Sequence, residues 1–113
     1  MKATVQYYRT AKAENPVKDF LESLSKQQKA KVFRIFITIE RYGLLAILPH
    51  IKKLSGTPLW EIRILGKDSI RIIYVSIEQN IVCVLHGFIK KRQKTSQKDI
   101  EIALNRHKNL LAK

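Results

Sequence analysis

The densest group of charged side chains lies in residues 86–94, where four cations follow an apolar run within five positions. These cations are Lys90, Lys91, Arg92 and Lys94. A strand that ends just before a helix begins offers a phosphate group fixed donors and a favourable dipole. The segment is therefore a candidate phosphate-binding site, with a solvated charged surface as the alternative.

A second group of charges lies in two strand-like segments. Residues 59–64 alternate in type, so Glu61 and Arg63 point to one face and the apolar side chains to the other. Arg71 stands within residues 70–74, where a strand would normally place an apolar side chain. A long cation there needs a partner, or it must extend its guanidinium to the sheet edge. The structural alternative to a catalytic role is that Glu61 pairs with an arginine across neighbouring strands, worth ~0.2–1 kcal/mol.

The overall charge points to an anionic partner. The chain of 113 residues carries 22 basic and 9 acidic residues, a formal net charge of +13. A protein this basic gains free energy by docking onto a polyanion, which predicts nucleic acid or an acidic protein as its partner. The alternative is a basic surface that serves solubility alone.

Other chemistries are not indicated by the sequence. His50, His86 and His107 are far apart and accompany the single Cys83, so no metal-ligand spacing appears. There is no phosphate-binding glycine loop, dinucleotide motif or nucleophile elbow. We therefore expect no metal and no cofactor. Cys83 stands in an apolar run and is expected to be a buried small hydrophobe.

The sequence also indicates where the protein works. A lone cysteine suits a reducing compartment, the first residues lack the apolar core of a signal peptide, and no apolar stretch reaches membrane-spanning length. We expect a soluble, cytoplasmic protein with no membrane partner.

The elements that position these side chains begin with a short β-branched and aromatic strand at residues 4–8. Asn15 and Pro16 then start a helix, because Asn15 can accept from free backbone N–H groups and proline loses nothing at the first helical position. The apolar stripe of this helix is expected to comprise Val17, Phe20, Leu21 and Leu24.

Ser25 starts a second helix, with Gln28 three residues later completing a capping box. The short connection between the two helices predicts that they fold back on each other as a helical hairpin. Residues 44–50 are apolar but aperiodic, which predicts a connecting loop that turns Leu45 and Leu48 inward. The expected buried face of the second helix comprises Val32, Phe33, Ile35, Phe36 and Ile39.

Three strands follow, at residues 59–64, 70–77 and 81–89, with turns at 66–68 and 78–80. They predict a three-stranded antiparallel meander. The third strand is nearly continuous in apolar residues, as expected for a central strand covered on both faces.

Ser96 caps a C-terminal helix, and Asp99 stands favourably near its positive end. The order of N-terminal strand, helical hairpin, meander and C-terminal helix predicts a single α+β domain over residues 1–113. The expected inward stripe of the last helix comprises Ile100, Ala103, Leu104, His107 and Leu111.

Four motifs together resemble a known family. They are KKLSG at residues 52–56, LWEIR at 59–63, IRIIY at 70–74 and HGFIKKRQKT at 86–95. This pattern is similar to that of the RelE/HigB toxins, especially their phage-derived, HigB-like relatives. The resemblance covers nearly the whole chain, with the specific motifs in residues 52–106. It implies a RelE-like fold and a toxin of a type II toxin–antitoxin system, many of which cleave mRNA on the ribosome without a metal.

The resemblance also implies roles for individual residues. Arg71 matches the family arginine that contacts the scissile phosphate, and Arg63 and Glu61 stand where relatives present basic or acidic catalytic groups. Lys90 and Lys91 match the cations at the end of the last strand. Further catalytic candidates are Lys94 and His86, and the RNA-binding candidates are Lys52, Lys53, Arg92 and Lys98.

The expected reaction is RNA cleavage by attack of a ribose 2′-hydroxyl on the adjacent phosphate. Arg71 and Arg63 would bind the phosphate oxygens, and one lysine would serve as the acid. Glu61 is the first candidate for the base, ahead of His86, which can equally be a hydrogen-bonded structural histidine. Several relatives place a proton-transferring tyrosine or histidine near the C-terminus, where this chain offers only His107. The identity of the base stays open.

Two other functions compete with the ribonuclease. One is a toxin of the ParE kind, which inhibits DNA gyrase by binding and has no nuclease activity. The other is a non-toxic, basic nucleic-acid-binding module. The toxin readings imply a cognate antitoxin protein, expected to be of the helix-turn-helix type, and the ribonuclease reading adds mRNA and the ribosome as partners.

Overall fold

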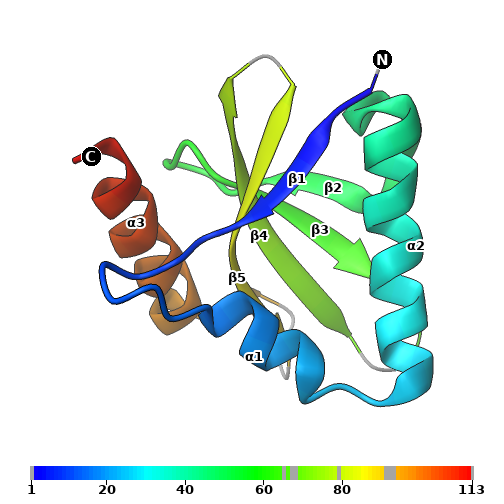
Figure 1. Cartoon of the computed structure of the whole chain (residues 1–113), viewed down its shortest axis with the longest axis horizontal. Coiled ribbons are helices and arrows are strands. Elements are labelled where there is room, and N and C mark those ends of the chain that lie inside the picture. The colour runs from blue at the N-terminus through cyan, green and yellow to red at the C-terminus, as the bar shows by residue number, and fades with distance from the viewer. Residues whose placement is uncertain (1, 65, 67–68, 79, 91–93, 113) are drawn as a thin grey trace.

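The computed structural model describes residues 2–64, 66, 69–78, 80–90 and 94–112, and within them the chain forms a five-stranded sheet with helices on both faces (Figure 1). The strand order is β1-β5-β4-β3-β2, with β1 parallel to β5 and the other neighbouring pairs antiparallel. The elements are β1 (Thr4–Tyr7), α1 (Pro16–Glu22), α2 (Lys26–Tyr42), the 3-10 helix η1 (Leu44–His50), β2 (Ile51–Lys53), β3 (Trp60–Ile64), β4 (Ile70–Glu78), β5 (Ile81–Ile89) and α3 (Gln97–Leu111). The α+β class is confirmed.

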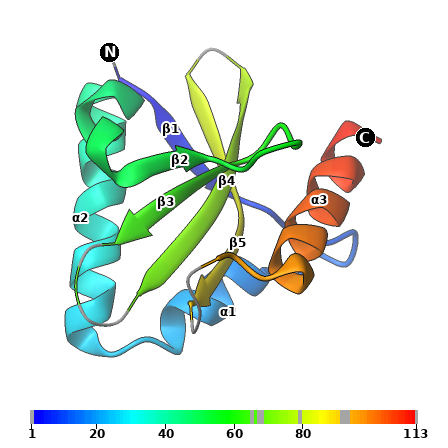
Figure 2. The ribbon, with the colours of Figure 1, turned by 180° about the vertical axis from the view of Figure 1, so that it is seen from behind.

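The sheet separates two apolar cores. On one face Val17 of α1 and Phe36 of α2 lie in a core with Ile62 of β3, and on the other Ala103 of α3 lies in a core with Leu85 of β5. Helix α3 packs on β5 and β4, and Figure 2 shows β2 and β3 lying away from it. The α3 face of the sheet is therefore only half covered, because one helix cannot cover all five strands.

The predicted helix starts are confirmed. The Asn15 side chain accepts from the Lys18 N–H at 3.0 Å. Ser25 and Gln28 form the reciprocal capping box, with hydrogen bonds of 2.8 and 3.1 Å. Ser96 likewise caps α3 and accepts from the backbone N–H of Asp99, as expected for a helix N-terminus.

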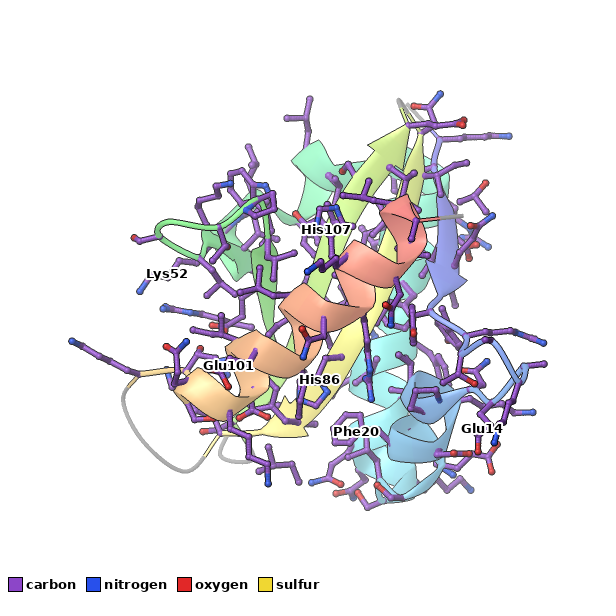
Figure 3. The ribbon with its side chains drawn as sticks, turned by 90° about the vertical axis from the view of Figure 1, so that its left-hand side faces the viewer. Glu14, Phe20, Lys52, His86, Glu101 and His107 are labelled. Carbon is purple, nitrogen blue, oxygen red and sulfur yellow. The ribbon has the colours of Figure 1, made fainter. Side chains whose placement is uncertain are left out.

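The predicted helical hairpin is wrong. Helix α1 packs on β5, whereas α2 packs on β1 and η1, and Figure 1 shows the two helices strongly inclined to each other. The apolar stripes of both helices lie in one core with side chains of the sheet. Gly87 of β5 allows α1 to pack closely on this strand, since a Cβ at Gly87 would stand 2.5 Å from the ring of Phe20. Figure 3 shows Phe20 beside the end of β5.

The predicted loop at residues 44–50 is also wrong, because it forms the 3-10 helix η1. Ile47 is its buried residue, whereas Leu45 and Leu48 are 79% and 53% exposed. Ile47 stands at a kink within η1, where its backbone angles (φ −119°, ψ 20°) are not helical. Strand β2 then follows directly and adds a fourth antiparallel strand to the expected meander.

The remaining predictions on the core are mostly confirmed. The three strands of the meander form, and β5 lies between β1 and β4 with both faces covered. Cys83 is buried, and this burial raises the pKa of its thiol to about 11. Phe33 and Leu111 are exposed, contrary to expectation. The buried residues of α2 are Val32, Phe36 and Ile39, and in the last turn of α3 it is Leu110 that packs against the apolar cluster.

Two predicted turns fall partly outside the described residues, at 67–68 and at 79. No helix in the described part of the chain is long and apolar enough to cross a membrane.

Candidate phosphate-binding site

The register of the sheet brings the predicted charges of three strands to one face. Arg63 of β3 stands directly opposite Arg71 of β4, and Lys52 of β2 stands opposite Glu61 of β3. Cross-strand partners point to the same face, and residues two apart on a strand share it. All four side chains therefore project from the face that α3 covers only in part.

Glu61 lies at the centre of this group and is 1% exposed. Its Oε1 is 3.8 Å from Nε of Arg63 and 3.6 Å from Nε of Arg71. The arginine side chains are 39% and 15% exposed, respectively. Two cations directly opposite each other repel, and the carboxylate between them offsets this repulsion. The predicted pairing of Glu61 with an arginine is thus present, with both arginines at once.

The Nε atoms of Arg63 and Arg71 are buried and have no hydrogen-bond partner among the residues that the structure describes. Buried polar groups are usually hydrogen-bonded, so two unsatisfied donors at one point are unusual. Arg71 donates through one terminal nitrogen to the carbonyl of Ile70 at 3.1 Å. The arrangement presents donors and positive charge that a tetrahedral anion with several oxygens would satisfy.

Thr95 completes the group, and sequence reasoning missed it. Its Oγ1 donates a short hydrogen bond to Oε2 of Glu61. Both oxygens of the carboxylate are therefore engaged, one by the arginines and one by the hydroxyl. The only signal in the sequence was the position of Thr95 between the basic run and the cap of the last helix.

Lys90 lies in the electrostatic field of this group. Partial burial lowers the pKa of its ammonium from the ordinary value, and the charge of Arg71 lowers it further. Arg63 and Lys52 act in the same direction, whereas Glu61 opposes them. A lysine with a lowered pKa releases its proton more readily, which suits a general acid.

His86 is placed differently from the arginines. Its Nε2 lies 2.7 Å from Oδ1 of Asp99, and its Nδ1 lies 3.5 Å from a terminal nitrogen of Arg106. Burial lowers the pKa of His86, while Asp99 raises it and Arg106 lowers it again. Figure 3 shows His86 beside α3. Since both ring nitrogens contact residues of α3, the geometry suits a histidine that fastens this helix to β5.

A bulge in the sheet explains why His86 points this way. The partner of Ile73 is His86 but the partner of Tyr74 is Val84, so Leu85 is the extra residue. A bulge re-aims side chains, and here both Leu85 and His86 face α3.

The predicted RNA-binding residues separate into two sets. Lys52 is exposed at the outer strand of the group, where Figure 3 labels it. Lys53, one residue on, points to the opposite face and lies over the ring of Trp60, with its nitrogen 5.4 Å from the ring centroid.

Two of the other predicted cations lie near the start of α3. Lys94 and Lys98 are exposed and line a pocket with Phe88 and Lys90. Lys91 and Arg92 lie outside the described residues. No group of three or more His, Cys, Asp or Glu side chains that could hold a metal ion occurs among the residues that are described.

The fold and this site define an α+β protein with a cationic, half-open sheet face. The family model described as Phage derived protein Gp49-like (DUF891) matches residues 19–108. The chain therefore belongs to this family, which is known as a family of RelE-like toxins. No curated protein matches the sequence.

Proposed function

We propose that the protein is the toxin of a type II toxin–antitoxin system and acts as a HigB-like endoribonuclease that cuts mRNA on the ribosome. Membership of a family known as RelE-like toxins supports the first part of the proposal. The second part is supported by one observation. Arg63 and Arg71 stand opposite each other on neighbouring strands and share one buried carboxylate, with Lys90 in the same field.

The proposed reaction is a metal-independent transesterification. The 2′-oxygen attacks the adjacent phosphorus, the bond from phosphorus to the 5′-oxygen breaks, and the products are a 2′,3′-cyclic phosphate and a 5′-hydroxyl. The guanidinium groups of Arg63 and Arg71 stabilise the charge that develops on the phosphorane oxygens. Lys90 gives a proton to the leaving 5′-oxygen.

Substrate binding would also release the base. In the free protein Oε1 of Glu61 faces both arginines. A bound phosphate competes for the same Nε donors and draws the guanidinium groups toward itself. Oε1 is then free to accept the 2′-hydroxyl proton, while Oε2 stays on Thr95. General acid–base help of this kind is typically worth ~10²–10⁴-fold in rate.

The antitoxin is proposed to be a helix-turn-helix protein that holds the toxin inactive. It would act by covering the cationic face or by blocking access to the ribosome, over an interface of standard size. The net charge of +13 favours an acidic partner surface.

The test is to express the wild type and an Arg71→Lys variant in cells and to map mRNA 5′ ends. Lysine keeps the charge but loses the forked donor, so we expect new 5′ ends with the wild type and at least tenfold fewer with the variant. Arg34→Lys is the matched control, because Arg34 is exposed on α2, which covers the opposite face.

Three outcomes would count against the proposal. Growth arrest with intact mRNA and DNA-damage signalling would indicate a gyrase inhibitor. Harmless expression with salt-dependent RNA binding would indicate a simple binding module. Equal cleavage by the wild type and by Arg71→Lys would remove Arg71 from the site.

A further inference from the structure

We propose that Thr95 is a positioning residue, whose hydroxyl anchors Oε2 of Glu61 so that Oε1 stays aligned with Arg63 and Arg71. Its effect on cleavage rests on the proposed function, whereas its effect on the arginines does not. The resemblance and the charge pattern assign Thr95 no role.

The first support is the surroundings of the carboxylate. Glu61 is the single charged side chain among the fully buried residues of the described chain, and a buried charge needs its full set of partners. The arginines approach one oxygen at 3.6 and 3.8 Å, beyond hydrogen-bonding distance. Among the described residues, the side chain of Glu61 accepts one hydrogen bond, from the hydroxyl of Thr95. It therefore sets which way the carboxylate faces.

The second support is where Thr95 stands in the chain. It lies directly before Ser96, the N-cap of α3, and directly after Lys94. At the other end of the same connection, the N–H of Lys90 donates to the carbonyl of Ser69 at 2.9 Å. The connection from β5 to α3 is thus fixed to the sheet at both of its ends, once beside β4 and once at Glu61 on β3.

The proposed reaction gives this anchor its greatest importance when substrate is bound. Once a phosphate draws the arginines away, the hydroxyl of Thr95 is what still holds Glu61 in place. Loss of the anchor should therefore lower kcat more than it raises KM, because it acts after phosphate binding.

The experiment compares Thr95→Val with Thr95→Ser in the full-length protein. Valine has nearly the shape of threonine but no donor, whereas serine keeps the hydroxyl. The control is Thr10→Val, because the Thr10 hydroxyl also donates to a glutamate, Glu14, at 3.3 Å, at an exposed site between β1 and α1. The first readout is the pair of arginine Nε–H signals of Arg63 and Arg71 in ¹H–¹⁵N NMR spectra. The second is kcat and KM for cleavage of ribosome-bound mRNA.

We expect Thr95→Val to shift or broaden both Nε–H signals and to lower kcat about tenfold, with KM changed less than about twofold. Thr95→Ser should restore the signals and most of the rate, and Thr10→Val should change neither. Unchanged Nε–H signals in a folded Thr95→Val protein would overturn the proposal. So would equal perturbation by valine and serine. Should the valine variant fail to fold, Thr95→Ala carries the same prediction.

The two proposals fail separately. If the wild type does not cleave RNA but the arginine signals respond to Thr95→Val and recover with Thr95→Ser, the proposed function is wrong and the positioning role stands. If the wild type cleaves RNA and Thr95→Val cleaves it with unchanged kcat and unchanged arginine signals, the reverse holds.

Discussion

The replacement of Glu61 by glutamine tests the centre of the site most severely. The substitution keeps the shape of the side chain but removes the one charge that separates Arg63 from Arg71. At the observed distances of 3.6 and 3.8 Å, each ion pair carries an attraction of about 4–5 kcal/mol at an effective dielectric constant of ~20. Most of this attraction is offset by the cost of removing the charges from water.

The net loss can be bounded from burial. Breaking a buried ion pair by removing one partner costs about 3–5 kcal/mol, since an uncompensated charge remains. Arg71 is 15% exposed but Arg63 is 39% exposed, and water screens Arg63 in part. We therefore expect Glu61→Gln to lower the free energy of unfolding by about 3 kcal/mol, at the low end of that range.

The assay is urea unfolding at pH 7, followed by circular dichroism. The matched control is Glu22→Gln, because Glu22 pairs with Lys18 at 3.8 Å where both side chains are exposed. An exposed helix pair contributes about 0.3–0.5 kcal/mol, so the control should lose no more than that. The loss at Glu61 should also persist in ~1 M salt, where the Debye length is about 3 Å and surface pairs are screened.

Two results would refute this reasoning. A loss at Glu61 no larger than at Glu22 would show that the carboxylate does not compensate the arginines. A loss that disappears in high salt would show that the pair is solvated. The same variant should cleave RNA at least ~10²-fold more slowly if Glu61 takes the proton.

Three further predictions concern the framework of the site. Burial lowers the pKa of His86 below the ordinary 6.5, so the unfolded chain takes up this proton at a higher pH than the folded protein does. The free energy of unfolding should therefore fall as the pH drops below about 6.5. Urea unfolding at pH 5 and pH 7.5 should show a smaller fall for His86→Gln than for the wild type. Gly87→Ala should cost about 1–3 kcal/mol, measured as a lower Tm, because its Cβ would stand 2.5 Å from Phe20 and α1 must shift. Cys83, whose pKa burial raises to about 11, should react with a thiol reagent at pH 8 no faster than the protein unfolds; rapid labelling of the native protein would contradict its burial.

The sequence predicted the part of the site that depends on strand alternation. Glu61 and Arg63 share a face because they are two residues apart on one strand, and that much needs no knowledge of the fold. That Arg71 would stand directly opposite Arg63 depends on the register of β3 and β4, which no single segment determines. The cationic character of the site was therefore predictable, but its pairing was not.

Other features lie beyond sequence reasoning for identifiable reasons. Thr95 and Glu61 are 34 residues apart and meet only after the sheet and α3 have formed. His86 faces α3 because Leu85 is bulged, and the alternating pattern around it does not reveal an extra residue. Strand β2 is three residues long and contains two lysines, so no apolar pattern marks it. Leu45 is apolar but exposed, because Ile47 is the residue of η1 that is buried in the core.

The central claim is that Arg63, Arg71 and Glu61 act on a phosphate beside a ribose 2′-hydroxyl. The most direct measurement uses ribosomes programmed with an mRNA in which the nucleotide 5′ to the cut site carries 2′-deoxyribose. The account predicts that the purified protein cuts the all-ribose message, leaves a 2′,3′-cyclic phosphate, and does not cut the substituted message at that position. Cleavage of both messages at the same rate would contradict it.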